Sequence, residues 1–228
     1  MSSWFAPKWP KKKPLPKPPL PLPTVGQRYA GVKDGEPTHY LVDLLTGTTS
    51  GPELPEADLK TWWERRNAVN RWFHSMGYPS AINASKKPWC EGPYGRESQA
   101  IAAFEPRRNF LTTEATARLM LEMALGQCVN PDRSRQMLEL MARDFTAPAA
   151  DPEDQAHGYT GLALKPGTKL WSKCGLTSQT RHDAALVELP SGKRIILVIF
   201  TTDHAIERDL IPTVAREILS SISSPPGR

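Results

Sequence analysis

The segment Lys173-Cys174-Gly175 places a cation, a thiol and a residue without a side chain at consecutive positions. On an edge strand beside a cleft, a lysine ammonium attracts a carboxylate, and glycine lets a ligand approach the backbone. Cys174 supplies less than a hydroxyl would, because S–H is a weak hydrogen-bond donor. The same residues also fit an ordinary strand end, with Lys173 in solvent and Cys174 as a half-buried filler. The residue types therefore predict either an anion-recognition site or a plain strand.

The cysteines and histidines follow no metal-binding or disulfide pattern. The three cysteines are odd in number and far apart, and the five histidines include no H-x-x-x-H; the cysteines are Cys90, Cys128 and Cys174. Disulfide frameworks and zinc sites need even or closely spaced ligands. We therefore expect no metal and no cofactor.

The first 24 residues carry the net positive charge of the whole chain. They hold eight of the 23 prolines, five lysines and no acidic residue, and the rest of the sequence is formally neutral. A basic domain face is not indicated, so we expect no nucleic-acid partner. Proline and lysine favour extended, solvated polyproline II, which predicts a disordered tail over residues 1–24. Lys13, Pro16 and Pro19 also have the K-x-x-P-x-x-P spacing of peptides that dock into aromatic grooves, which would give the tail a partner.

Targeting and membrane signals are missing from the sequence as written. No apolar run of secretory length follows the lysines, and no stretch approaches the roughly 20 apolar residues of a membrane span. We therefore expect no membrane association and a cytoplasmic location.

Residues 38–145 have the apolar spacing of helices joined by a long loop over 78–111. Within residues 53–78 one apolar stripe predicts a single amphipathic helix that ends at Gly77. A second helix is expected to begin at a Thr112 cap, and a third after Asn130-Pro131. The stripe of the first helix consists of Leu59, Trp62, Val69, Phe73 and Met76.

Residues 165–222 are rich in β-formers and end in an amphipathic segment. Three strand-length runs lie within residues 169–202, and a Pro190-Ser191-Gly192 turn joins the last two, which predicts antiparallel neighbours. Residues 204–222 are predicted to form a terminal helix, with Pro212 in its first turn or at a kink.

This order of elements, with the residues it carries, resembles the class A β-lactamase and penicillin-binding serine hydrolase family. In that family a Thr-capped helix precedes a Ser-Arg helix, here Ser134-Arg135, and then a Lys-Thr-Gly or Lys-Ser-Gly strand, here Lys173-Cys174-Gly175. A hairpin and a packed C-terminal helix follow, so residues 112–222 carry most of the resemblance. It implies an α/β (α+β) fold over residues 38–222, with a helical part and an antiparallel sheet covered by the C-terminal helix.

The resemblance also implies site residues. Lys173, Cys174 and Gly175 would bind a substrate carboxylate. Glu91 resembles the loop glutamate that activates water for deacylation, with Glu97 as the alternative. Ser50 would stand in the Ser-Asp-Asn loop, although Gly51 and Pro52 follow it. Asn70 or Asn67 would replace the asparagine that holds the substrate amide.

The nucleophile motif of the family, Ser-x-x-Lys, is absent, because no serine has a lysine three positions later. The helix and two strands with which the family begins also have no room in residues 1–37. The sequence therefore predicts a truncated serine hydrolase of low activity whose substrate is a carboxylate-bearing small molecule or peptide. The alternative is a non-catalytic binding module on the same scaffold.

Overall fold

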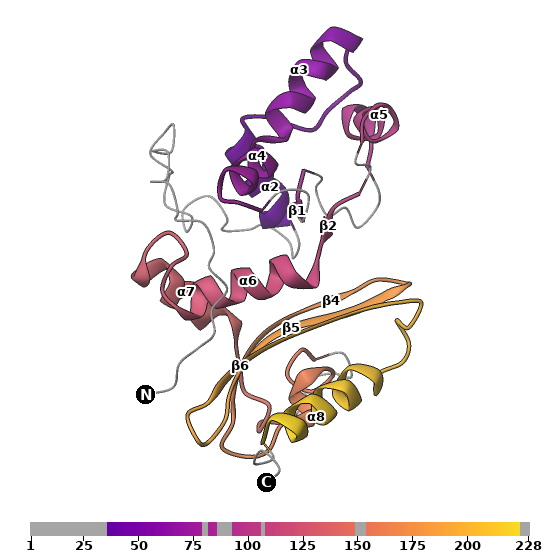
Figure 1. The fold of residues 1–228 in the computed structure, drawn as a ribbon. Coiled ribbons are helices and arrows are strands. Elements are labelled where there is room, and N and C mark those ends of the chain that lie inside the picture. Colours follow the sequence, from indigo (N-terminus) through magenta and orange to yellow (C-terminus); the bar gives the residue numbers. More distant parts are fainter. Residues whose placement is uncertain (1–35, 79–81, 86–92, 106–107, 149–153, 224–228) are drawn as a thin grey trace. The chain divides into compact units, whose positions relative to one another are not determined.

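A computed structural model describes residues 36–78, 82–85, 93–105, 108–148 and 154–223 (Figure 1). The proline-rich residues 1–24 and Glu91 lie outside these ranges, so the predictions made for them stay predictions. The chain divides into two compact units, Met1–Leu111 (unit 1) and Thr112–Arg228 (unit 2). Each unit has its own core.

The described part of unit 1 is mainly helical, and its core lies between α3 and α5. Leu59, Trp62 and Ala100 are buried there, and the rings of Trp63 and Phe104 stack beside them with centroids 5.4 Å apart. The two short strands pair antiparallel. The elements are α2 (Glu36–Thr46), α3 (Glu56–Arg66), α4 (Ala68–Ser75), β1 (Ile82–Asn83), α5 (Gly95–Ala103) and β2 (Phe110–Leu111).

The apolar stripe of residues 53–78 runs over two helices, so the prediction of one continuous helix is wrong. The break lies at Asn67, which ends α3 and precedes α4. Its side chain donates to the carbonyl of Trp63 at 2.8 Å, so it bonds to the backbone one turn back. Asparagine favours such local bonds over a continuous helix. The predicted end at Gly77 is confirmed, with a φ of 76°.

The segment 78–111, predicted to be a loop, contains α5 and the β1–β2 pair. The buried residues of α5 are Glu97 and Ala100, a carboxylate and a methyl group. Such a helix has no apolar stripe, and this is the reason that periodicity misses it.

Unit 2 is built on a four-stranded sheet in the order β3-β4-β5-β6, with every neighbouring pair antiparallel. The predicted three antiparallel strands over residues 169–202 are therefore confirmed. The elements are α6 (Thr113–Ala124), α7 (Pro131–Met141), β3 (Ala142–Arg143), the 3-10 helix η1 (Thr160–Ala163), β4 (Lys169–Leu176), β5 (Thr180–Glu188), β6 (Arg194–Thr202) and α8 (Leu210–Ser223).

The helix caps of unit 2 form as the sequence predicts. The Thr112 hydroxyl accepts from the Ala115 N–H at 3.1 Å, and the Asn130 side chain accepts from the Arg133 N–H at 2.9 Å. Each bond satisfies one of the N–H groups that a helix start leaves open. Pro212 lies in the first turn of α8, where no backbone N–H is needed.

The terminal helix is shorter than predicted, because it begins at Leu210 and not at His204. Residues 204–209 form turns, in which the Glu207 N–H donates to the carbonyl of His204 at 3.2 Å. The carbonyl of Ala205 accepts instead from the buried Arg181 guanidinium at 3.2 Å. This tertiary contact keeps the segment out of the helix.

The two faces of the sheet carry different cores, and Figure 1 shows α6 on one side and α8 on the other. Ala184 and Leu186 of β5 pack against Met120 of α6. On the opposite face Ala185 and Val187 pack with Leu170, and this cluster also contacts Phe145, Leu164 and Leu189. Ala215 of α8 is buried in the same unit. Helices within the described ranges are too short or too polar to cross a bilayer.

Candidate active site

Within the described part of the chain, side chains and not a neighbouring strand bind the outer edge of β4 beyond Trp171. β3 pairs with β4 at two positions only. Further along, the Arg143 guanidinium donates to the carbonyl of Ser172 at 2.9 Å. The Cys174 N–H donates to the side-chain oxygen of Gln155 at 3.4 Å, and the same oxygen accepts from Arg143 at 3.2 Å. The edge of β4 around Lys173-Cys174-Gly175 is therefore open to a ligand once these side chains release it.

Lys173 is exposed at this edge, and its ammonium donates to the carbonyl of Cys174 at 2.5 Å. Lys169, four positions earlier on the same face, forms an ion pair with Glu188 at 2.7 Å. Lys173 has no such pair with any described residue, so no carboxylate balances its charge. An incoming carboxylate would meet a cation that has no carboxylate partner among the described residues.

Cys174 and Gly175 differ in how the fold uses them. Side chains alternate along a strand, so the Cys174 thiol lies on the face opposite Lys173, across from Asp183. The thiol is free and half-buried. A Cβ added at Gly175 would meet the His182 Cβ at 3.6 Å, which is ordinary contact. No contact within the described part of the chain therefore requires glycine at 175.

Behind the β4 edge lies a buried carboxylate that the sequence analysis missed. Asp183 is 1% exposed, and its Oδ2 accepts from the Thr160 N–H at 3.0 Å. Burial raises the pKa of Asp183, and the bonds from Thr160 oppose the shift without cancelling it. This carboxyl ties η1 to the strand next to β4.

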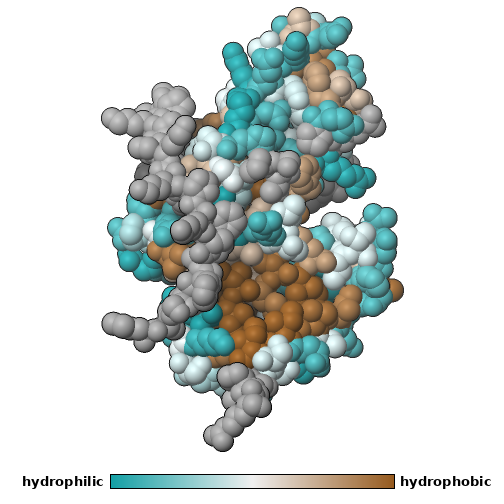
Figure 2. Space-filling model, viewed as in Figure 1, coloured by the Kyte–Doolittle hydropathy of each residue, from teal (hydrophilic) through white to brown (hydrophobic). Residues whose placement is uncertain are grey.

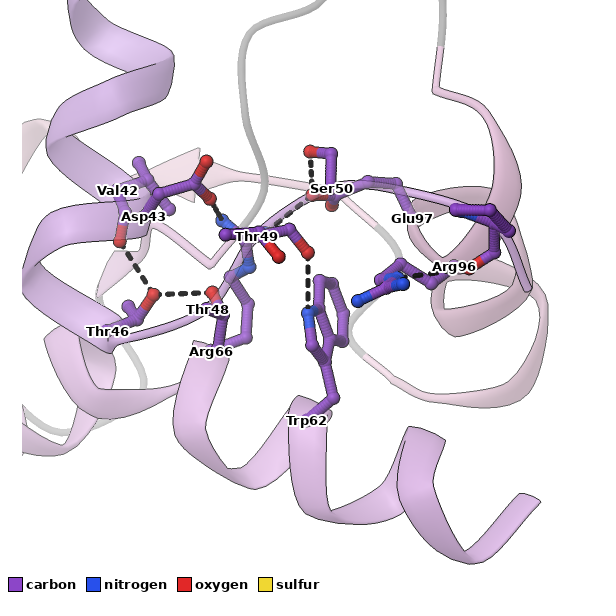
Figure 3. Close-up of polar contacts among 11 residues, drawn as sticks. Val42, Asp43, Thr46, Thr48, Thr49, Ser50, Trp62, Arg66, Arg96 and Glu97 are labelled. Carbon is purple, nitrogen blue, oxygen red and sulfur yellow. Dashed lines mark hydrogen bonds and ion pairs between the residues drawn. The ribbon is translucent and has the colours of Figure 1, made fainter. Parts of the chain in front are cut away.

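In unit 1, Ser50 is bonded to a buried ion cluster (Figure 3). The Ser50 hydroxyl donates to Glu97 Oε1 at 2.9 Å, and the same oxygen accepts from Arg66 Nη2 at 2.6 Å. Arg66 Nη1 lies 3.1 Å from Asp43 Oδ1. Arg66 is fully buried, Glu97 is 2% exposed and the Asp43 side chain is 19% exposed, so one buried cation pairs with a buried carboxylate and a partly exposed one.

Trp62 covers the Arg66 guanidinium in this cluster. The guanidinium carbon lies 4.6 Å from the ring centroid, and the indole N–H donates to the carbonyl of Thr49 at 2.9 Å. Burial lowers the pKa of Arg66, and the charges of Glu97 and Asp43 act against that shift. The carboxylates are therefore needed to keep the buried cation favourable.

The segment that carries Ser50 is bonded along α5. The Arg96 N–H donates to the carbonyl of Gly51 at 3.1 Å. The Gln99 side chain accepts from the Leu54 N–H at 3.0 Å and donates to the Leu54 carbonyl at 2.8 Å. These contacts fix the chain on both sides of Pro52, and they hold the Ser50 hydroxyl against Glu97.

Asn70 lies in a separate network of amides, in which both N–H groups of its side chain are used. Its NH₂ donates to Asn67 at 2.9 Å and to Asn83 at 2.7 Å, and its oxygen accepts from the Ala84 N–H at 2.8 Å. A substrate carbonyl would have to displace one of the two bonds that the Asn70 NH₂ donates. The geometry gives Asn70 an organising role inside unit 1.

The predicted site residues therefore fall into two groups. Ser50 and Glu97 meet in unit 1, while Lys173, Cys174 and Gly175 lie on one strand of unit 2. Arg66 was missed because its partners Asp43 and Glu97 are far away in sequence, which leaves no local signal. Within the described ranges, His, Cys, Asp and Glu nowhere gather as a group of three that could hold a metal ion.

Comparisons with known proteins give a match to one family model. The model, described as the beta-lactamase enzyme family, matches residues 64–223. A search of curated proteins gives no match.

Two solved structures have similar folds at low sequence identity. A beta-lactamase from Sphaerobacter thermophilus is 20% identical with a TM-score of 0.54, over 85% of this chain and 60% of that one. The chromosome-encoded beta-lactamase of Vibrio parahaemolyticus is 14% identical with a TM-score of 0.52, over 72% of this chain and 58% of that one. The chain thus spans about three fifths of the length of these neighbours.

Proposed function

The chain belongs to the beta-lactamase enzyme family, and on that premise we propose that it carries the substrate-recognition strand of a class A β-lactamase-like serine hydrolase. Its ligand would be a β-lactam, or a related amide or ester, that bears a carboxylate. Hydrolysis in such an enzyme passes through an acyl-enzyme on a serine.

The uncompensated charge of Lys173 at the open edge of β4 carries this proposal. The ammonium has no carboxylate partner among the described residues, whereas Lys169 of the same strand has one. A ligand carboxylate would replace the bond from the Lys173 ammonium to a neutral carbonyl with an ion pair, in which donor and acceptor are both charged. Gly175, which the fold does not require, leaves room for the ligand beside the strand.

Acyl transfer by this chain should be slow, because its candidate serine is poorly activated. No serine has a lysine at the third following position. Ser50 donates to Glu97, but the accepting oxygen is also bound by the Arg66 guanidinium at 2.6 Å. A carboxylate oxygen held by a cation is a weak base for a hydroxyl proton. We expect only the low residual hydrolysis rate that serine hydrolases keep when their nucleophile is removed.

Binding of benzylpenicillin by isothermal titration calorimetry tests the proposal. Lys173→Ala should weaken binding about 10- to 100-fold, since a charge-assisted hydrogen bond is worth about 1.5–3 kcal/mol. Lys169→Ala is the matched control, because its ammonium is already paired with Glu188, and it should leave the affinity unchanged. The penicillin methyl ester, which lacks the carboxylate, should bind wild type no better than Lys173→Ala binds the acid. Equal affinities of the two lysine variants for the acid would overturn the proposal.

A non-catalytic binding module is the second candidate, favoured by the missing Ser-x-x-Lys motif. Such a module would bind the carboxylate through Lys173 without breaking a bond. Grafting a Ser-x-x-Lys helix and its two strands from a related hydrolase onto the amino end separates the two candidates. Turnover that depends on Lys173 supports the hydrolase, and a folded but inactive graft supports the module.

A further inference from the structure

A groove opens in unit 2 where three segments of the chain meet. They are residues 163–168 after η1, residues 189–193 in the turn between β5 and β6, and residues 216–222 of α8. The groove, called the α8 groove below, has a volume of about 840 Å³. Sites for single small molecules have volumes of roughly 300–1,000 Å³. The size of the α8 groove therefore suits one small ligand.

The floor of the α8 groove is apolar. Figure 2 shows apolar side chains gathered over the sheet of unit 2, and the groove adds four large ones from its three segments. Two of them, Leu164 and Leu189, pack against the buried core cluster of the sheet, and Leu219 is 8% exposed. The floor is thus continuous with the core, and a ligand that covers it removes apolar surface from water. The four residues are Leu164, Leu189, Leu219 and Ile222.

Hydrogen bonds fix the walls of the α8 groove. In the turn between β5 and β6, the Leu189 N–H donates to the carbonyl of Lys193 at 2.9 Å, and the Gly192 N–H donates to the carbonyl of Leu189 at 2.8 Å. The Lys193 ammonium donates to the carbonyl of Ile222 at 3.2 Å, which joins the turn to the end of α8. A ligand therefore meets a groove whose shape is already formed.

The charged side chains that line the α8 groove are all basic. Lys165, Lys193 and Arg216 line it and are exposed, and no lining residue is acidic. None of the three forms an ion pair with another described residue. Glu188, the acidic residue next to the turn in sequence, is already paired with one cation of β4 and one of β6. Residues 224–228, which follow α8, read Ser-Pro-Pro-Gly-Arg and add no acidic side chain. The groove therefore attracts an anion.

We propose that the α8 groove binds a single-chain amphiphile, an apolar chain with an anionic head that is a carboxylate or a phosphate. The chain would lie on the apolar floor, and the basic side chains would hold the head. The volume of the groove favours one such molecule over a protein partner, which needs a much larger surface. Lys173, Cys174 and Gly175 do not line the groove, so this site is independent of the proposed recognition strand.

Calorimetric titration of the full chain with four probes tests the chemistry of the ligand. Decanoate and decyl phosphate should bind at one site, and the tighter of the two identifies the head group. 1-Decanol, which has the same chain and no charge, should bind about ten-fold more weakly than decanoate. Butanoate should also bind at least about ten-fold more weakly, because its short chain leaves most of the floor in water. Equal affinities for decanoate and 1-decanol, or for decanoate and butanoate, would overturn the proposal.

Substitutions of charged side chains locate the site. Arg216→Gln should weaken decanoate binding about two- to five-fold, and Lys165→Gln combined with it about ten-fold, because each exposed ion pair contributes little. Thr213→Glu is the matched control: it changes the charge of α8 by the same one unit, but residue 213 is exposed and does not line the groove. Lys173→Ala separates the groove from the β4 edge, and both variants should leave the affinity unchanged. Equal losses in Arg216→Gln and Thr213→Glu, or a loss in Lys173→Ala, would overturn the assignment to the groove.

Removal of residues 224–228 tests whether the segment that follows α8 competes with the ligand. The shortened chain should bind decanoate with the affinity of the full chain, because the groove is built from residues 163–222. Decanoate binding that is seen only in the shortened chain would show that this segment fills the groove, and it would overturn the proposal.

Discussion

The Ser50 hydroxyl donates to Glu97 Oε1 at 2.9 Å across 47 positions of sequence. The bond joins the Ser50 segment to the first turn of α5. Glu97 also neutralises Arg66, so the same carboxylate orients a candidate site serine and supports a buried cation. The ion pair with Arg66 should contribute much more to the free energy of unfolding than the hydrogen bond from Ser50. Substitutions at Glu97 and at Ser50 separate the two contributions.

Glu97→Gln should destabilise unit 1 far more than Ser50→Ala. Removing the charge leaves Arg66 buried with Asp43 as its remaining carboxylate, and breaking a buried pair costs about 3–5 kcal/mol. Losing one neutral donor costs about 1 kcal/mol. Urea unfolding followed by tryptophan fluorescence measures both. Similar losses for the two variants would mean that Glu97 contributes little to holding Arg66.

Gly95→Ala should be much more harmful than Gly47→Ala. Both glycines have positive φ, 51° and 63°, so alanine costs about 1–2 kcal/mol of backbone strain at either position. At Gly95 an added Cβ would also lie 2.1 Å from the carbonyl of Gly51, whereas at Gly47 it meets nothing within 4 Å. The extra clash should lower the melting temperature of unit 1 well below that of the Gly47 variant. Equal melting temperatures would show that the Ser50 segment is not held against α5.

The raised pKa of Asp183 predicts a loss of stability as pH rises. The folded protein favours the protonated carboxyl, so this contribution is complete below the unfolded pKa near 3.8 and is lost as pH rises through the folded pKa. Asp183→Asn keeps an acceptor for Thr160 and removes the titration, so its stability relative to wild type should grow with pH. Urea unfolding at several pH values measures this.

Glu188 provides a control of opposite sign for that experiment. The side chains of Lys169 and Arg194 lower the pKa of Glu188, so its contribution is present above the unfolded pKa and disappears as pH falls. Glu188→Gln should therefore cost stability at neutral pH and cost nothing in acid. A parallel response of the Asp183 and Glu188 variants would contradict the assignment of Asp183.

Gly175→Ala should separate ligand binding from folding. The added methyl group would make ordinary contact with His182, so the melting temperature should stay within error. Benzylpenicillin should bind less tightly, because the methyl group occupies the space beside the β4 edge. Unchanged affinity in calorimetry would exclude close approach of the ligand to residue 175.

Fluorescent penicillin should not label the chain covalently, and a chromogenic cephalosporin should turn over no faster than in buffer. The reason is the lack of an activated serine, since Ser50 bonds to a carboxylate that Arg66 already holds. Labelling that disappears in Ser50→Ala would make Ser50 a nucleophile. Labelling that disappears in Cys174→Ser would assign the reaction to the free thiol.

Short-range patterns in the sequence were enough to predict most of unit 2. The strands of residues 169–202 and the caps at Thr112 and Asn130 depend on neighbouring residues, and all of them form. The helix break at Asn67 and the late start of α8 were not predicted. In the first place the Asn67 side chain bonds to the carbonyl of Trp63, and in the second the Arg181 side chain bonds to the carbonyl of Ala205. The spacing of apolar residues cannot predict such bonds.

The candidate site was harder to predict than the fold, because its contacts are long-range. Arg66 is 31 residues from Glu97, and the sequence around either residue contains no pattern that predicts their ion pair. Asp183 reads as a polar residue in a strand, yet it is buried against Thr160. Lys173 is the exception, since its strand position follows from local pattern.

The contact between Gln99 and Leu54 has a consequence for how this part of the chain can vary. Gln99 binds the N–H and C=O of residue 54, which every amino acid except proline offers. A change of side chain at 54 leaves both bonds in place. Gln99→Glu, by contrast, would set a second acceptor against the Leu54 carbonyl. The position of the Ser50 segment therefore depends on the side chain at residue 99 and does not depend on the side chain at residue 54.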